Sequence, residues 1–160
     1  MPALNKSKRK RNIHEYISGY TDGEGCFNVS FSRRDKFLIG WETKPSFCIS
    51  QNEDRAQPLY QMKIIFDCGF MRRDYSDKTL KYEVRSLNDL LRKVIPFFDQ
   101  YPLLSSKRKD FGLFKKVCLL MQKNRHRNPK GFKKVVSIAF KMNPGGKRRY
   151  SKKAIFDSLR

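Results

Sequence analysis

The most constraining feature of this 160-residue chain is an abrupt change in the spacing of its apolar residues near position 25. Before that point they recur at i, i+3, i+4 and i+7, the spacing of an amphipathic helix, at Ile13, Tyr16, Ile17 and Tyr20. Asn12 is a suitable N-cap, and Gly23 and Gly25 are expected to end the helix near residue 22. After that point they alternate with polar residues, at Phe27, Val29 and Phe31. A helix that leads directly into a strand with one buried face is therefore predicted.

Similar patterns divide the rest of the chain into strands and helices. The expected strands cover 41–50, 70–74 and 80–85, and Pro45 indicates a bulge or an edge in the first of them. The expected helices cover 56–67, 87–95, 106–123 and 132–142, with Pro96 ending the second and a short helix following Ser151. The order α-β-β-α-β-β-α, with helices appended, predicts an α+β fold in which helices cover one face of a four-stranded antiparallel sheet. We expect residues 12–160 to form this single domain and residues 1–11 a basic disordered arm.

The charge balance points to a polyanionic partner. Lys and Arg number 36 and Asp and Glu number 15, which gives a net charge of +21 and a pI near 10.1. A surface this basic attracts nucleic acid first of all. No apolar stretch is long enough to span a bilayer, and the first residues do not resemble a secretory signal. Four dispersed cysteines without a C-x-x-C pair make a zinc site improbable and predict reduced thiols in an intracellular protein, in an organelle or a prokaryotic cytoplasm.

The polar face of the predicted sheet is a candidate nucleic-acid surface. Alternation assigns to it Asn28, Ser30, Ser32, Arg34, Glu42, Lys44, Ser46, Arg72, Lys81 and Arg85. Amides, hydroxyls and guanidinium groups are the groups that read base edges in a major groove. The alternative is a face that is simply solvated, as in many antiparallel sheets. The net charge favours contact with DNA or RNA.

Two carboxylates stand at the expected end of the first helix. Asp22 and Glu24 lie where the helix dipole already presents negative charge, so a bound divalent cation would relieve their repulsion. Mg²⁺ prefers such oxygen ligands, and beside a phosphodiester it supports hydrolysis. Gly19 and Gly23, four residues apart, would also let two copies of the helix cross closely. The alternative is a solvated turn of the D-G-E-G type.

The segment from Tyr16 to Phe27, Y-I-S-G-Y-T-D-G-E-G-C-F, resembles the LAGLIDADG motif of homing endonucleases. Ser18-Gly19 occupies the small-residue slot, and Glu replaces the commoner final Asp. Further blocks are similar to the family in order and spacing: Gln51 with Arg55, 97–104 with 106–111, and 141–143 with 146–148. The resemblance therefore extends over nearly the whole chain from Ile13.

The resemblance implies a role for each site residue. Glu24 would be the metal-binding acid, helped by the Gly23 carbonyl, and Asp22 a structural residue at the helix end. Lys107 would lie near the scissile phosphate, with Gln51 and Arg55 ordering water or phosphate around it. Arg108 or Lys109 would replace Lys107 if the register differs. Cys26 and Cys48 are expected to contribute packing or weak base contacts at most.

The resemblance also implies an assembly and an activity. A single motif implies a homodimer whose interface includes Ser18, Gly19 and Asp22, with the sheet as a saddle on the DNA. The implied function is that of an intron-encoded, site-specific double-strand DNA endonuclease that leaves short 3′ overhangs at a long, near-palindromic site. The implied cofactor is Mg²⁺, with Mn²⁺ or Ca²⁺ able to occupy the same site. The alternatives are an RNA-binding intron maturase without cleavage, or a non-catalytic basic protein that binds DNA or RNA.

Overall fold

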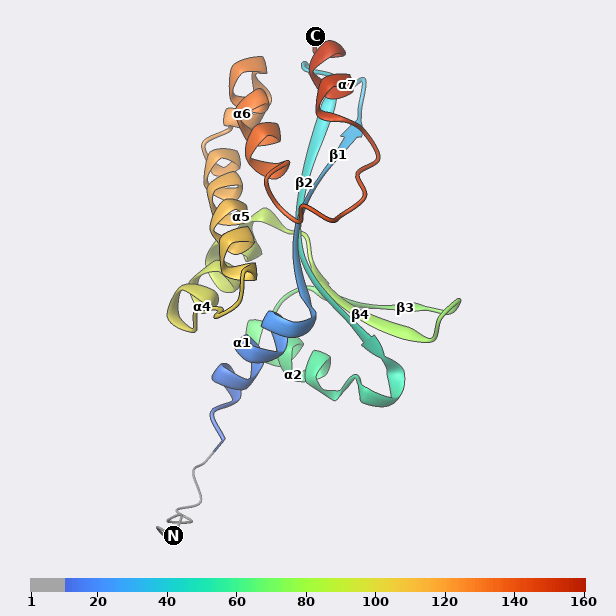
Figure 1. Cartoon of the computed structure of the whole chain (residues 1–160), viewed down its shortest axis with the longest axis vertical. Coiled ribbons are helices and arrows are strands. Elements are labelled where there is room, and N and C mark those ends of the chain that lie inside the picture. The colour runs from blue at the N-terminus through green and yellow to red at the C-terminus, as the bar shows by residue number, and fades with distance from the viewer. Residues whose placement is uncertain (1–10) are drawn as a thin grey trace, which may run out of the picture.

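The computed structural model describes residues 11–160 and confirms the α+β fold (Figure 1). The strands are β1 (Gly25–Arg33), β2 (Trp41–Asn52), β3 (Phe70–Asp74) and β4 (Thr79–Val84). The helices and helical turns are α1 (Ile13–Glu24), η1 (Glu53–Arg55), α2 (Gln57–Phe66), α3 (Leu87–Asp89), η2 (Leu90–Val94), α4 (Ile95–Gln100), α5 (Lys107–Gln122), η3 (Arg125–Arg127), α6 (Pro129–Ala139) and α7 (Lys152–Asp157). No helix within these residues has the length and apolar character needed to cross a membrane.

The four strands form one antiparallel sheet in the order β1-β2-β4-β3. Both β3 and β1 are therefore edge strands, and the long strands β1 and β2 run together through most of the molecule (Figure 1). The pairing of β1 with β2 is unbroken from Gly25↔Ile49 to Arg33↔Trp41, so of the bulge or edge predicted at Pro45 the bulge is absent. Pro45 instead lies before the point where β4 joins β2, so that only β1 pairs with it.

Aromatic residues join the sheet to the helices that cover its apolar face. The fully buried ring of Phe27 in β1 lies 5.2 to 5.5 Å, between ring centroids, from those of Phe47, Phe98, Phe111 and Phe114. These partners come from β2, α4 and α5, so one ring contacts the neighbouring strand and two helices of the core. Such contacts add specific geometry to the burial of large apolar surfaces. Because α4 and α5 pack on the face that carries Phe27, they leave the opposite face of the sheet uncovered.

The first helix turns directly into the first strand. The side chain of Asn12 accepts hydrogen bonds from the backbone N–H groups of His14 and Glu15, as expected of an N-cap. The helix ends at Glu24, two residues later than predicted, and Gly25 is already the first residue of β1. A Cβ atom at Gly25 would lie 2.6 Å from the Thr21 side chain, so this tight transition requires glycine. The transition holds Glu24 at the point where helix and sheet meet.

The prediction that Pro96 ends a helix is wrong. The chain continues through the π-helical turn η2 into α4, and Pro96 occupies the first turn of α4. The wider turn accommodates a residue that has no N–H to donate, so the helical path is adjusted without being interrupted. The predicted helix 132–142 is also displaced: α6 begins at Pro129, where Asn128 accepts from the N–H of Gly131, and it ends at Ala139. Proline at the start of a helix is favourable because that position needs no donor.

Candidate nucleic-acid interface

The strand register brings the predicted polar residues onto one face. Asn28 lies opposite Ser46, Ser30 opposite Lys44, Ser32 opposite Glu42, and Arg72 opposite Lys81. Arg34 and Arg85 follow directly after β1 and β4, and both are exposed. The ten residues therefore share one face of the sheet, and Ser46 differs from the others on it because it is buried, at 8% exposure. A continuous surface of amides, hydroxyls and cations results.

The acidic member of this set, Glu42, is held between two cations. Its carboxylate accepts from Nε of Arg34 at 2.9 Å and lies 3.3 Å from Nζ of Lys44. The Arg34 hydrogen bond holds the pKa of Glu42 below its ordinary value despite partial burial. The carboxylate therefore fixes the directions of two long basic side chains on the sheet face. An organised surface of this kind loses less entropy on binding than one with free side chains.

Sequence reasoning missed Asn52 because it ended the second strand at Ser50, and it did not assign Ser50 itself to the polar face. The strand continues to Asn52, and the register places Ser50 opposite Lys81 and Asn52 opposite Thr79. The face therefore extends over β4 with further hydroxyl and amide groups. The signal that could have revealed them is the polar side chain at every second position from Cys48 onward.

The carboxylate of Asp22 connects the end of α1 to the loop before α5. Its oxygens accept from the N–H of Leu104 at 2.7 Å, from the N–H of Ser105 at 3.0 Å, and from the Ser105 hydroxyl. Burial opposes ionisation, but the Ser105 hydroxyl, these two N–H groups and the nearby charge of Lys107 hold the pKa of Asp22 below its ordinary value. Asp22 thus lies where a structural residue at the helix end was expected.

Glu24 and Gly23 lie exposed at the same helix end. None of the ion pairs within residues 11–160 involves Glu24. Within the same residues, no three His, Cys, Asp or Glu side chains gather closely enough to form a metal site. An exposed carboxylate beside the carbonyl end of a helix can supply one ligand to Mg²⁺. This ion keeps several water ligands and also binds oxygens of the substrate. One copy of the chain would supply only the ligands at this helix end.

Two of the other predicted residues reach the last turns of α1. The Nζ atom of Lys107 donates to the carbonyl oxygen of Thr21 at 3.1 Å, and Nε2 of Gln51 donates to the hydroxyl of Tyr20 at 3.0 Å. The end of α1 is thus contacted from α5 and from β2. Arg55 is not brought into this group: it is exposed in η1, and its Nε atom lies 3.7 Å from Asp54.

The residues predicted for a dimer interface differ in exposure. Gly19 is exposed, and a Cβ atom built there or at Gly23 would meet nothing within 4 Å. Ser18 is only 7% exposed, and its hydroxyl donates to the carbonyl oxygen of Tyr101 at 2.8 Å. A groove of about 380 Å³ runs beside Gly19, with Leu104 among its lining residues. In the single chain, the surface of α1 at Gly19 is therefore open, whereas Ser18 is buried and stabilises the fold through its hydrogen bond.

Cys26 and Cys48 lie directly opposite each other at the end of the polar face nearest Glu24. A hydrogen bond from the Cys48 thiol, opposed by burial and supported by Lys107 and Lys81, lowers the pKa of Cys26 to about 7. The same interaction and burial raise the pKa of Cys48. The pairing of these two thiols was not anticipated, because register between strands is not visible in the spacing along one strand.

Comparison with known proteins assigns the chain to a family. Residues 17–118 match the model described as LAGLIDADG endonuclease. A probable intron-encoded endonuclease 2 of Neurospora crassa is 30% identical over 131 residues, which are 81% of this chain and 29% of that protein. The chain spans about a quarter to a half of the length of the first curated relatives that it matches.

Two solved structures share the fold. The homing endonuclease I-TnaI superposes with a TM-score of 0.79 at 30% identity, covering 91% of this chain and 94% of that one. I-SmaMI bound to an uncleaved DNA target in the presence of calcium ions gives a TM-score of 0.79 at 29% identity, covering 86% of this chain and 47% of that one. The family model covers more than half of the chain and the solved homing endonucleases share its fold, so the chain belongs to the LAGLIDADG endonuclease family.

Proposed function

We propose that this protein is a site-specific endonuclease that cuts both strands of a DNA duplex by metal-dependent phosphodiester hydrolysis. The observation that carries the proposal is the position of Glu24, exposed at the end of α1, where the polar face of the sheet begins at Cys26. A duplex on that face would bring a phosphate to the carboxylate. The names of the relatives as intron-encoded and homing endonucleases support the same function and an intron origin for the gene.

Glu24 and the Gly23 carbonyl would hold Mg²⁺, and the remaining ligands would be DNA oxygens and water. The bound cation would activate water and neutralise charge on the scissile phosphate. Calcium ions in the I-SmaMI complex support a divalent site in a relative, and Mn²⁺ or Ca²⁺ would fit the same oxygen ligands. Asp22 has no part in this set, because its carboxylate is engaged by Leu104 and Ser105.

Lys107 would act beside the scissile phosphate as a compact positive charge or a proton relay. In the free protein its ammonium group donates to Thr21 at 3.1 Å, within the same turn of α1 that precedes Glu24. Gln51, anchored on Tyr20, would order a water or phosphate oxygen nearby. Arg55 is exposed and bound only loosely by Asp54, so it would need to swing toward DNA to contribute.

Two copies of this unit would be needed, because one Glu24 serves one strand. The open surface at Gly19 and Gly23 supports a close crossing of two α1 helices. Exposed apolar side chains flank this surface, since Leu104 is 90% exposed and Tyr16 is 41% exposed. The chain also matches almost all of I-TnaI but less than half of I-SmaMI. A homodimer would read a long, near-palindromic site, with short 3′ overhangs left by the paired cuts.

The test compares the Glu24→Gln variant with the unmutated protein on a DNA site selected from a randomised library in the presence of Mg²⁺. We expect binding measured in EDTA, without a divalent cation, to stay within about threefold, because the carboxylate then makes no metal-mediated contact with DNA. Cleavage should fall by at least about 100-fold, because a metal ligand is lost. Asp157→Asn, an acid-to-amide change on α7, is the matched control and should cut normally.

Full cleavage by Glu24→Gln would remove Glu24 from the reaction and refute the proposal. Absence of cleavage by the unmutated protein, together with tight binding of a structured intron RNA, would instead favour the maturase alternative.

A further inference from the structure

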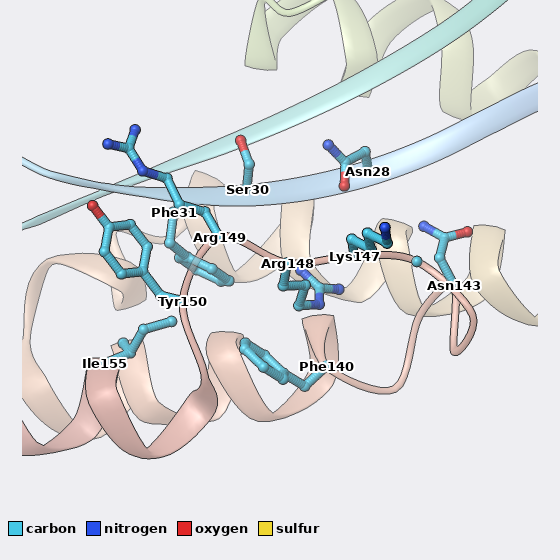
Figure 2. A pocket seen from close by; sticks show the side chains of 11 residues that line it. Asn28, Ser30, Phe31, Phe140, Asn143, Lys147, Arg148, Arg149, Tyr150 and Ile155 are labelled. Atoms are coloured by element: carbon cyan, nitrogen blue, oxygen red, sulfur yellow. The ribbon is translucent and has the colours of Figure 1, made fainter.

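The free edge of β1 is covered by a segment from the far end of the chain. Strand β1 is an edge strand, so alternate backbone groups have no neighbouring strand. The carbonyl oxygen of Phe27 accepts from Nδ2 of Asn143 at 2.8 Å, and that of Val29 accepts from Nη1 of Arg148 at 3.0 Å. Two side chains 5 positions apart thus take the place of a further strand and hold residues 143–148 along β1 (Figure 2). Covered edges of this kind also prevent unwanted pairing between sheets.

Arg148 is the anchor of this segment. Besides Val29, its guanidinium group donates to the carbonyl oxygen of Ala139, at the end of α6, and it lies 4.6 Å from the ring centroid of Phe140. The side chain is partly buried by these contacts. A guanidinium group shared between two carbonyls and one ring has a fixed direction, which neither a lysine nor a free arginine would have.

The inward direction of Arg148 leaves its two neighbours outward. Lys147 and Arg149 are both exposed, and Figure 2 shows them on either side of Arg148, along the strand that carries Asn28 and Ser30. The four side chains line one pocket of about 140 Å³. Asn28 and Ser30 belong to the polar face of the sheet, so the pocket continues that face around the edge of β1.

The chemistry of the pocket selects a small anion. Its lining residues include no Asp or Glu. None of the ion pairs within the described residues involves Lys147 or Arg149. The pocket is smaller than the roughly 300–1,000 Å³ typical of small-molecule sites, so a base or nucleoside would not enter it. A tetrahedral anion fits its size, its two cations without an ion pair and the amide of Asn28. Phe31, Phe140, Tyr150 and Ile155 form the apolar wall of the pocket, and the Arg149 guanidinium lies 5.4 Å from the ring centroid of Tyr150.

We propose that this pocket binds a phosphate of the DNA backbone where the duplex passes the edge of β1. Lys147 and Arg149 contact the phosphate oxygens, the amide of Asn28 donates from the sheet face, and Arg148 positions its two neighbours. This proposal rests on the proposed function, since it assumes that DNA lies on the polar face. Phosphate contacts set the register and affinity of a complex and not its sequence preference, so the site strengthens binding to any duplex.

The test is the salt dependence of DNA binding by the full chain, measured in Ca²⁺ with a fluorescent duplex of arbitrary sequence. Each phosphate contact contributes about 0.9 to the slope of log K against log salt concentration. Lys147→Ala combined with Arg149→Ala should therefore reduce the magnitude of the slope by about 0.9, because both side chains contact the same phosphate. The control combines Lys116→Ala with Lys134→Ala, two exposed lysines of α5 and α6 with the same change of charge, and its slope should equal that of the unmutated protein.

Arg148→Lys tests the positioning role separately. This variant keeps the net charge, so a purely electrostatic or purely structural role would leave the salt slope unchanged. We expect the slope to fall, and we expect faster amide hydrogen exchange in residues 143–150, because lysine cannot bridge Val29 and Ala139. An unchanged slope would refute the positioning role.

The outcomes also distinguish this proposal from the one on which it rests. If the unmutated protein bound duplex DNA without salt dependence, the proposed DNA face itself would fail. If the unmutated protein bound with a steep slope and the Lys147/Arg149 double variant matched the control, only the phosphate pocket would be refuted.

Discussion

Replacing Asp22 with Asn tests whether this carboxylate holds the acid-bearing helix to the rest of the site. The two oxygens receive three donors: the N–H groups of Leu104 and Ser105 and the Ser105 hydroxyl. An amide retains only one accepting oxygen and turns an NH₂ group toward a donor. At least one charge-assisted hydrogen bond is then lost, whichever way the amide lies.

The expected cost follows from that loss. Hydrogen bonds to charged groups contribute about 1.5–3 kcal/mol, and the partial exposure of Asp22 favours the lower half of this range. We therefore expect Asp22→Asn to lower the free energy of unfolding by about 2 kcal/mol at pH 7. For a chain of this size the melting temperature should fall by about 4–8 °C.

The pH dependence gives a second readout with a definite sign. Because the pKa of Asp22 is lower in the folded protein than its ordinary value of 3.8, its contribution is complete above that value. It is lost as the pH falls through the folded-state pKa. The difference between the two proteins should therefore be constant above about pH 5 and should shrink below pH 4.

Urea unfolding followed by circular dichroism, from pH 7 down to pH 3, measures both quantities. Asp54→Asn is the control. It removes the same charge from the same basic protein, but the one ion pair that Asp54 forms within residues 11–160 is exposed and spans 3.7 Å. That variant should change stability by less than about 0.5 kcal/mol. Equal urea midpoints for Asp22→Asn and Asp54→Asn at pH 7 would refute the reasoning, as would a difference that persists unchanged at pH 3.

Three further outcomes are expected. Gly19→Leu should give a folded monomer by light scattering, because the added side chain meets open space within its own chain but blocks a second helix; a dimer of unchanged mass would exclude the crossing at this residue. Gly131→Ala should destabilise the protein by about 1–3 kcal/mol in thermal melts, because its Cβ atom would lie 2.0 Å from a backbone carbonyl oxygen of the preceding turn. Gly145→Ala is the control and should be nearly neutral, because its Cβ atom would lie in open space. Mild oxidation with diamide should form a disulfide between Cys26 and Cys48, because directly opposed strand residues are within disulfide distance. Mass spectrometry after alkylation should then show two fewer alkylated thiols. Two thiols that remain free to react would contradict this geometry.

Local pattern alone was enough for the elements that form the sheet and its first helix. The alternation of Phe27, Val29 and Phe31 predicts β1, and the helical spacing from Ile13 to Tyr20 predicts α1, because each pattern records which side of a regular element meets the core. The same reasoning assigned ten polar residues to one face. It was wrong at Pro96, where the widened turn η2 lets the helical path continue, since tertiary packing overrides a local preference.

Local patterns along the chain predict most of its strands and helices, its charge and the motif that identifies the family. Only folding brings distant residues together: Asp22 contacts Ser105, Lys107 contacts Thr21, and Arg148 contacts the edge of β1 at Val29. These contacts join residues 83, 86 and 119 positions apart, and no periodicity of 2 or 3.6 residues carries information over such separations. They arise only when strand register and helix packing bring the donors and acceptors together. For that reason the acid-bearing helix could be predicted from the sequence, while the groups that hold it and the phosphate-sized pocket at the edge of β1 came only from the fold.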